Sequence, residues 1–220
     1  MVSGWGRAQR IAGPQDRCGS EWTGSWQRPN GGCRVHKKCT LAQQGLIPKK
    51  DPGEFQLIHN LSALHGASVN EAIDLALCSV KYASLDGALS LLRQLGPGTL
   101  MAKADIESAF RPLPVQSDDN HLLGLQFRGK FYYDRCMPMG CSVSCTYFEP
   151  FSTFLEWDFA KVSVPCAVIH YLGDFLFLGQ SCSDRDARSL AIFKSLMAEF
   201  GIPLAQEKMT GPTTEPKLIQ

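Results

Sequence analysis

Two aspartates stand where carboxylates could share metal ions. Asp105 ends a largely apolar run that begins at Thr99, and Asp174 lies in the turn of an apolar segment over residues 167–178. If both runs are strands of one sheet, the two carboxylates are expected to meet at one edge of it. Paired carboxylates that hold two divalent cations about 3.5–4 Å apart are the basis of two-metal phosphoryl transfer. A single Asp in a turn is ordinarily just solvated, so this interpretation depends on the flanking motifs.

A second set of metal-ligand side chains precedes this region. Cys33, His36 and Cys39 are closely spaced, and Cys18 lies upstream. A structural zinc ion takes four ligands, typically from two closely spaced pairs, and only one such pairing is present. Chance spacing is therefore preferred, and a zinc-binding interaction module over residues 18–39 is kept as an alternative. The sequence contains no G-x-S-x-G elbow, no P-loop and no H-E-x-x-H motif.

The elements that would position the aspartates can be predicted from apolar periodicity. One pair of strands is expected up to residue 50 and over 55–61, joined by a Pro52-Gly53 turn. Further strands are expected over 99–105, 122–127 and 131–136. Residues 167–178 are expected to form two strands that turn at Gly173-Asp174. Helices are expected over 85–95 after a Ser84 cap, over 142–159, and from a capping box of Ser183 and Asp186 to Gly201. This order predicts an α+β fold, an antiparallel sheet covered by helices on one face, close to a split βαβ unit.

Composition bounds the class of protein. With 44% apolar and 20% charged residues, the chain is neither collagen-like nor a coiled coil nor wholly disordered. The net charge of +1 is unevenly distributed along the chain. Residues 1–50 hold 9 basic and 2 acidic side chains, and the remainder has a net negative charge. Residues 1–44 lack periodicity and are expected to be irregular or poorly ordered. No secretory signal is visible, and no stretch approaches the roughly 18–20 apolar residues of a membrane span, so we expect an intracellular protein without membrane contact.

Several motifs in a fixed order resemble one enzyme family. The chain reads GLIPKKDPGEFQLIHNLS from Gly45, AKADIESAFRPLPV from Ala102, MPMGCSVSC from Met137, VIHYLGDFLF from Val168 and GIPLAQEK from Gly201. Residues 45–220 thereby resemble the fingers and palm of reverse transcriptases, most like those of tyrosine-recombinase (DIRS-like) retroelements. The resemblance implies a right-hand polymerase palm with partial fingers, built on a ferredoxin-like antiparallel sheet. It also implies RNA-directed DNA polymerase (nucleotidyltransferase) chemistry with two Mg²⁺ ions.

The resemblance places a catalytic centre on the palm. Asp105 matches the first catalytic carboxylate, a ligand to both metals, and Ile106 matches a position whose backbone carbonyl lies beside the metal. Asp174 matches a carboxylate of the catalytic hairpin. Lys208 matches a lysine of the following motif, a candidate proton donor to pyrophosphate, with a solvated surface lysine as the alternative.

Four further positions match residues that bind the incoming nucleotide. Lys49 matches a fingers lysine that meets the triphosphate, again with a solvated lysine as the alternative. Phe110 matches the aromatic gate that excludes a ribose 2′-hydroxyl, and without the motif it would read equally well as a core aromatic. Gly140 matches a glycine where the backbone approaches the nucleotide closely. Gln56 takes the place of an arginine that clamps the α-phosphate.

The sequence departs from the family at two of these positions. The hairpin reads Tyr171-Leu172-Gly173-Asp174, whereas the family has Tyr-x-Asp-Asp, so Gly173 replaces the more important carboxylate. Losing a metal ligand from a two-metal centre costs orders of magnitude in rate. Gln56 supplies neither the charge nor the bidentate fork of an arginine, so nucleotide affinity is expected to fall as well.

Two hypotheses follow for the function. The first is a domain that copies RNA or DNA template-primers with dNTPs, impaired or inactive through Gly173; the second is a catalytically dead palm that binds nucleic acid or folds as a relic. The expected organisation is an N-terminal segment (1–44), partial fingers (45–100) and palm (101–220). Parent polyproteins of such retrotransposons also carry ribonuclease H. Since the chain ends at Gln220, before a thumb or ribonuclease H domain would fit, we expect a truncated reading frame of a transposable element.

Overall fold

The structure is a computed structural model, and it describes residues 43–48, 55–63, 65–127, 130–162, 167–181 and 183–214. The chain divides into two compact units. Unit 1 contains the residues up to Cys78 together with Phe110–Ser144, and unit 2 contains Ser79–Ala109 together with the residues from Cys145 onward. Each unit is described by itself.

Unit 1 holds two antiparallel hairpins. Strand β1 (Gln43–Pro48) pairs with β2 (Phe55–Asn60), and β4 (Gly124–Phe127) pairs with β5 (Lys130–Tyr133). Short 3-10 helices follow β2 at Asn70–Ala72 and Leu75–Cys78, and another precedes β4 at Ser117–Leu123. Both hairpins were expected from short apolar runs separated by turn residues, Pro52-Gly53 in the first case and Arg128-Gly129 in the second.

Unit 2 is built on a four-stranded antiparallel sheet in the order β6-β7-β3-β8. Its strands are β3 (Leu100–Asp105), β6 (Ala167–Tyr171), β7 (Asp174–Gly179) and β8 (Thr210–Thr213). Because β7 is antiparallel to both of its neighbours, β3 and β6 run in the same direction with β7 between them. This is the split βαβ arrangement that the element order predicted, and it confirms the α+β fold class.

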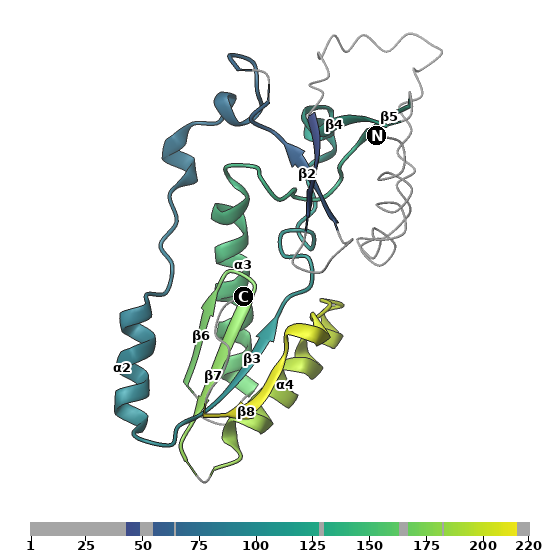
Figure 1. The fold of residues 1–220 in the computed structure, drawn as a ribbon. Helices are drawn as coiled ribbons and strands as arrows, with labels where there is room; N and C mark the ends of the chain where they lie inside the picture. Colours follow the sequence, from purple (N-terminus) through teal and green to yellow (C-terminus); the bar gives the residue numbers. More distant parts are fainter. Residues whose placement is uncertain are drawn as a thin grey trace. The chain divides into compact units, whose positions relative to one another are not determined.

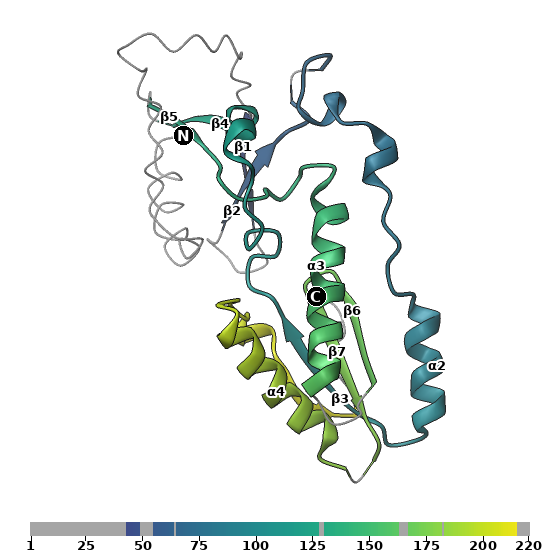
Figure 2. The same ribbon diagram turned by 180° about the vertical axis from the view of Figure 1, so that it is seen from behind.

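Two helices cover one face of this sheet, the face turned toward the reader in Figure 2. Helix α3 (Ser144–Val162) leads into β6, and α4 (Arg185–Glu199) connects β7 to β8 (Figure 1). Phe159 of α3 and Phe193 of α4 are fully buried and lie 5.7 Å apart, ring centre to ring centre. Both rings contact Phe177 of β7, so an aromatic cluster joins the two helices to the sheet. Burying each such ring contributes roughly 1.5–3 kcal/mol.

The third helix of unit 2, α2 (Leu85–Leu95), begins and ends as its sequence signals predict. The Ser84 hydroxyl accepts a hydrogen bond from the Gly87 amide at 3.1 Å, which is an N-cap. Gly96 follows the last residue with φ +88°, a conformation that favours glycine. In the part of the chain that the structure describes, no helix is both long and apolar enough to cross a membrane.

Two local predictions were wrong. The turn between β6 and β7 is made by Leu172 and Gly173, with Leu172 at φ +50°, so Asp174 is the first residue of β7 and not part of the turn. Ser183 and Asp186 form no capping box, because the Ser183 hydroxyl donates to the Gln180 carbonyl. Asp186 is instead fully buried against Gly179, where the missing side chain leaves room for its carboxylate.

Candidate functional site

The two aspartates expected to act together face each other in the sheet of unit 2. Asp105, at the end of β3, is the register partner of Asp174, at the start of β7. Asp105 is buried, while the side chain of Asp174 is about two-fifths exposed. Burial and the neighbouring Asp174 carboxylate raise the pKa of Asp105, against the opposing effect of Lys208. The pairing of two strand ends therefore brings two carboxylates together, as the sequence predicted.

Each of these carboxylates has a lysine partner. The Lys208 ammonium lies 3.2 Å from Asp105 Oδ2 and donates a hydrogen bond to it. The Lys103 ammonium lies 2.7 Å from Asp174 Oδ1. Lys208 was singled out from the sequence, but Lys103 was not. Lys103 is two residues before Asp105 on β3, and this alternate spacing puts both side chains on one face of the sheet, which is the signal that could have identified it.

Gly173 lies beside the aspartate pair, and its surroundings would accept a side chain. A Cβ atom built there would lie 3.6 Å from Ile106 Cβ, 3.7 Å from the Ile106 carbonyl oxygen and 3.2 Å from Ala109 Cβ. Only the contact with Ala109 is tight. Gly173 itself is not in the left-handed region of φ, so this position does not require glycine for its backbone. The Ile106 amide donates to the Gly173 carbonyl at 2.9 Å, which fixes the two residues next to each other.

On the helix-covered side of the same sheet, His170 of β6 is held between two carboxylates of α3. Its Nε2 lies 3.2 Å from Glu149 Oε1, and its Nδ1 contacts Glu156 Oε2. Burial alone would lower the pKa of His170, but the bonds to Glu156 and Glu149 outweigh it, and the pKa is raised. These three residues were not predicted from the sequence, since nothing in their spacing joins β6 to α3.

The raised pKa of His170 gives a first prediction. Because protonated His170 is favoured in the folded state, its stabilisation is complete below the unfolded pKa of about 6.5 and is lost as pH rises through the raised folded value. We expect the free energy of unfolding, measured by urea titration, to fall over that pH window, and a His170→Gln variant to lose this slope. His59→Gln is the control variant. Because burial lowers the pKa of His59, its effect on the free energy of unfolding lies at lower pH than this window. An unchanged slope in His170→Gln would contradict the assignment.

In unit 1, Gly140 occupies a position that favours glycine. Its φ is +99°, and a Cβ atom there would lie 3.1 Å from the backbone oxygen of His59. The Asn70 side chain fixes this loop, because its amide nitrogen donates to the Gly140 carbonyl at 2.8 Å and its oxygen accepts from the Ser142 amide at 2.9 Å. A side chain at Gly140 would therefore face both an unfavourable φ and a backbone clash.

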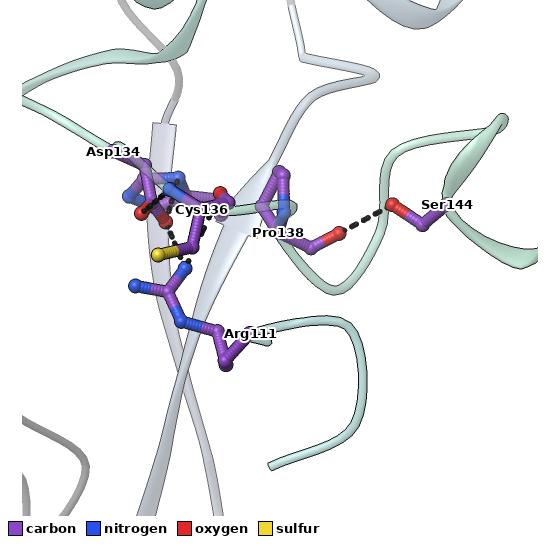
Figure 3. Close-up of polar contacts among 6 residues, drawn as sticks. Arg111, Asp134, Cys136, Pro138 and Ser144 are labelled. Atoms are coloured by element: carbon purple, nitrogen blue, oxygen red, sulfur yellow. Dashed lines mark hydrogen bonds and ion pairs between the residues drawn. The ribbon is translucent and has the colours of Figure 1, made fainter. Parts of the chain in front are cut away.

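Phe110, the expected sugar gate, is also in unit 1, where it is buried and has φ +76°. Such a φ is unusual for an aromatic residue and marks a backbone held by its surroundings. The next residue, Arg111, forms an ion pair with the buried Asp134, with Nη1 2.5 Å from Oδ2. Asp134 Oδ1 also accepts from the Cys136 amide, as Figure 3 shows. The Phe110 segment is thus anchored to the chain that leads to Gly140.

The remaining predicted residues have mixed outcomes. Gln56 lies in β2 opposite Ile47, and Lys49 lies outside the described residues. The candidate zinc ligands Cys18, Cys33, His36 and Cys39 also lie outside them. Within the described ranges, no three His, Cys, Asp or Glu side chains come together so as to hold a metal ion. Asp105, Ile106, Asp174 and Lys208 are brought together in unit 2, and Phe110 and Gly140 are positioned in unit 1.

Comparisons with known proteins agree with this fold. A family model described as reverse transcriptase (RNA-dependent DNA polymerase) matches residues 47–217. No curated protein is significantly similar in sequence.

Among solved structures, a foamy viral protease-reverse transcriptase in complex with double-stranded DNA has a TM-score of 0.60 at 17% identity, over 79% of this chain and 28% of that chain. The prototype foamy virus protease-reverse transcriptase has a TM-score of 0.61 at 18% identity, over 79% and 21%. A foamy viral complex with an RNA/DNA hybrid has a TM-score of 0.56 at 17% identity, over 78% and 21%. At these identities the likeness shows the fold, and the chain spans only 21–28% of each of these proteins.

Proposed function

Because this chain belongs to the reverse transcriptase (RNA-dependent DNA polymerase) family, we propose that it is a retroelement-derived domain that binds a template-primer but is impaired or inactive in DNA synthesis. The observation that carries the proposal is Gly173. It lies beside Ile106 and next in sequence to Asp174, where the resemblance calls for a carboxylate. The fold is retained around this position, so the loss affects chemistry before it affects structure.

The residues present do not fit a centre for two divalent ions. Domains of this family generally use divalent metals, and the resemblance expects two Mg²⁺ ions here. Among the described residues of unit 2, Asp105 and Asp174 lie opposite each other at this edge, and each already has a lysine ammonium as its partner. Two-metal catalysis needs anionic oxygen ligands to hold the ions. We therefore propose no reaction step through a metal in this chain.

Roles are proposed for the other matched residues. Ile106 would offer its carbonyl beside the carboxylates, and Lys208 would act as a proton donor to pyrophosphate. On the nucleotide side, Lys49 and Gln56 would meet the phosphates. Phe110 would stack under the sugar, and the backbone at Gly140 would approach the nucleotide closely. The positive φ of Phe110 supports its proposed role. The Gly140 loop supports the other, because the Asn70 side chain holds its carbonyl and a Cβ atom there would meet backbone.

The partners and origin are proposals of the same kind. The similar foamy viral proteins are described in complexes with double-stranded DNA and RNA/DNA hybrid, which supports a template-primer and dNTPs as partners. We further propose a DIRS-like retrotransposon as the source, a division into fingers (45–100) and palm (101–220), and an intracellular location. The second candidate function is a catalytically dead domain that only binds nucleic acid, and it is favoured by the lysine-paired carboxylates.

Binding of a labelled template-primer tests the proposal. By fluorescence anisotropy we expect the purified chain to bind an RNA/DNA template-primer, and affinity to fall as salt rises, because phosphate contacts release counterions. A blunt duplex without a recessed primer end is the matched control and should bind more weakly. Failure to bind either duplex at low salt would refute the proposal and leave a folded relic.

A further inference from the structure

We propose that, with glycine at position 173, Lys103 and Lys208 are the counter-ions of the Asp105–Asp174 pair, so that this edge of the sheet is complete without a divalent cation. The inference rests on the proposed function only in taking these carboxylates as the ones that would face metal ions.

The sheet register puts the four groups together. Lys103 and Asp105 alternate on β3 and share a face, and Asp174 is opposite Asp105 on β7. That face is the one away from the α3–α4 cluster, since Phe175 and Phe177 occupy the helix-covered positions of β7. The Lys103 ammonium therefore reaches diagonally to Asp174 Oδ1 at 2.7 Å, and Lys208 reaches Asp105 Oδ2 at 3.2 Å.

Because Lys103 is buried, its charge requires a nearby counter-ion. The Lys103 side chain is only 11% exposed, and a charge so placed requires a partner, because the desolvation cost is otherwise uncompensated. The partner is Asp174, so removing either side chain leaves the other charge uncovered. Lys208 is different, with more than half of its side chain exposed, and its pair is expected to contribute less.

The same geometry disfavours a divalent cation. A cation on Asp174 would compete with the Lys103 ammonium for Oδ1, or would bind Oδ2 and lie close to that like charge. Mg²⁺ is usually held by one or two carboxylates, with water and substrate phosphates as its other ligands. At this edge both aspartates already pair with a lysine ammonium, and Gly173 offers no further carboxylate. The two carboxylates and two ammonium groups together carry no net charge, so little electrostatic attraction is left for a metal.

Two hypotheses for Lys103 differ in the metal dependence that they predict. If Lys103 is the counter-ion of a metal-free site, removing its charge should create a demand for a cation at the two carboxylates. If Lys103 is an ordinary ion pair beside a working metal site, the unmodified chain should already respond to metal. Only the first reading predicts that metal dependence appears in the variant and is missing in the parent chain.

The experiment compares thermal unfolding of the unmodified chain, Lys103→Met and Lys194→Met, each in EDTA and in millimolar Mg²⁺ or Mn²⁺. Lys194 is an exposed residue of α4, so Lys194→Met makes the same change of charge away from the site. We expect Lys103→Met to lose roughly 5–15 °C in midpoint in EDTA, and to regain part of it with Mg²⁺. The unmodified chain and Lys194→Met should show no metal-dependent shift. Mn²⁺ binding by electron paramagnetic resonance should appear only in Lys103→Met.

Further variants keep the test decisive. If Lys103→Met does not fold, Lys103→Gln removes the charge while keeping a hydrogen-bond donor, and the same metal response is expected. Adding Asp174→Asn to either variant should abolish the response. A metal-dependent shift in the unmodified chain, or none in both Lys103 variants, would overturn the counter-ion proposal. Primer extension by the unmodified chain would overturn both proposals, because it requires metal ions at these carboxylates. Absence of template-primer binding would overturn the proposed function alone.

Discussion

Changing Gly173 to Asp together with Gln56 to Arg is expected to raise primer extension by about 100-fold or more over the unmodified chain. The first change returns a carboxylate next to Ile106 and Asp174, and electrostatic stabilisation of the transferring phosphoryl group is worth several kcal/mol. The second returns a charged, bidentate phosphate ligand. The measurement is extension of a labelled primer on RNA and DNA templates with Mg²⁺ or Mn²⁺.

The structure supplies the controls for this gain. An asparagine at position 173 has nearly the size of an aspartate but carries no charge, so Gly173→Asn should leave primer extension at background. Because a side chain at this position meets Ala109 Cβ at 3.2 Å, Ala109→Gly should relieve any strain and should not itself create activity. Asp105→Asn in the restored chain should abolish the gain. Equal activity of the Asp and Asn variants at Gly173 would show that charge is not what is missing.

Replacing Phe193 by Ala is expected to be the most destabilising single change in unit 2, costing about 3–5 kcal/mol of unfolding free energy. The Phe193 ring is fully buried and lies 4.6 Å from Phe175, 5.2 Å from Phe177 and 5.7 Å from Phe159, centre to centre. These rings come from α3, α4 and β7, so the cavity would open where the helices meet the sheet. Since small domains have about 5–15 kcal/mol in total, much of the stability would be lost.

Urea denaturation followed by circular dichroism measures this loss. Phe193→Leu should cost far less than Phe193→Ala, because it keeps most of the apolar volume. Phe200→Ala, just beyond α4, is the matched control: its side chain is 43% exposed and its removal should cost little. A Phe193→Ala variant as stable as Phe200→Ala would mean that the aromatic cluster does not hold this sheet and its helices together.

Much of the fold could be predicted from local signals. The Ser84 cap and Gly96 bound α2 because each satisfies or releases backbone groups at the helix end. The apolar run to Asp105 and the hairpin around Gly173 gave β3, β6 and β7, because short apolar segments bounded by turn residues form strands. The meeting of Asp105 and Asp174 followed from that, since strand ends in one sheet share an edge.

What could not be predicted depends on tertiary packing. The turn moved to Leu172-Gly173 because the register with β3 puts Asp174 into β7, and the sheet overrides the preference for Gly-Asp in a turn. Asp186 is buried against Gly179, where the absence of a side chain leaves room for its carboxylate, and no local pattern reveals this contact. The partner of Lys103 likewise depends on which strand lies next to β3, and sequence alone does not order the strands.

We propose that this reverse transcriptase domain keeps its fold but has lost the chemistry at Gly173. The decisive measurement is primer extension by the unmodified, purified chain on RNA and DNA templates, with Mg²⁺ and with Mn²⁺. We expect no product above the level of an Asp105→Asn control. Clear extension by the unmodified chain that disappears in Asp105→Asn would contradict it, and would show that two carboxylates suffice at this edge of the sheet.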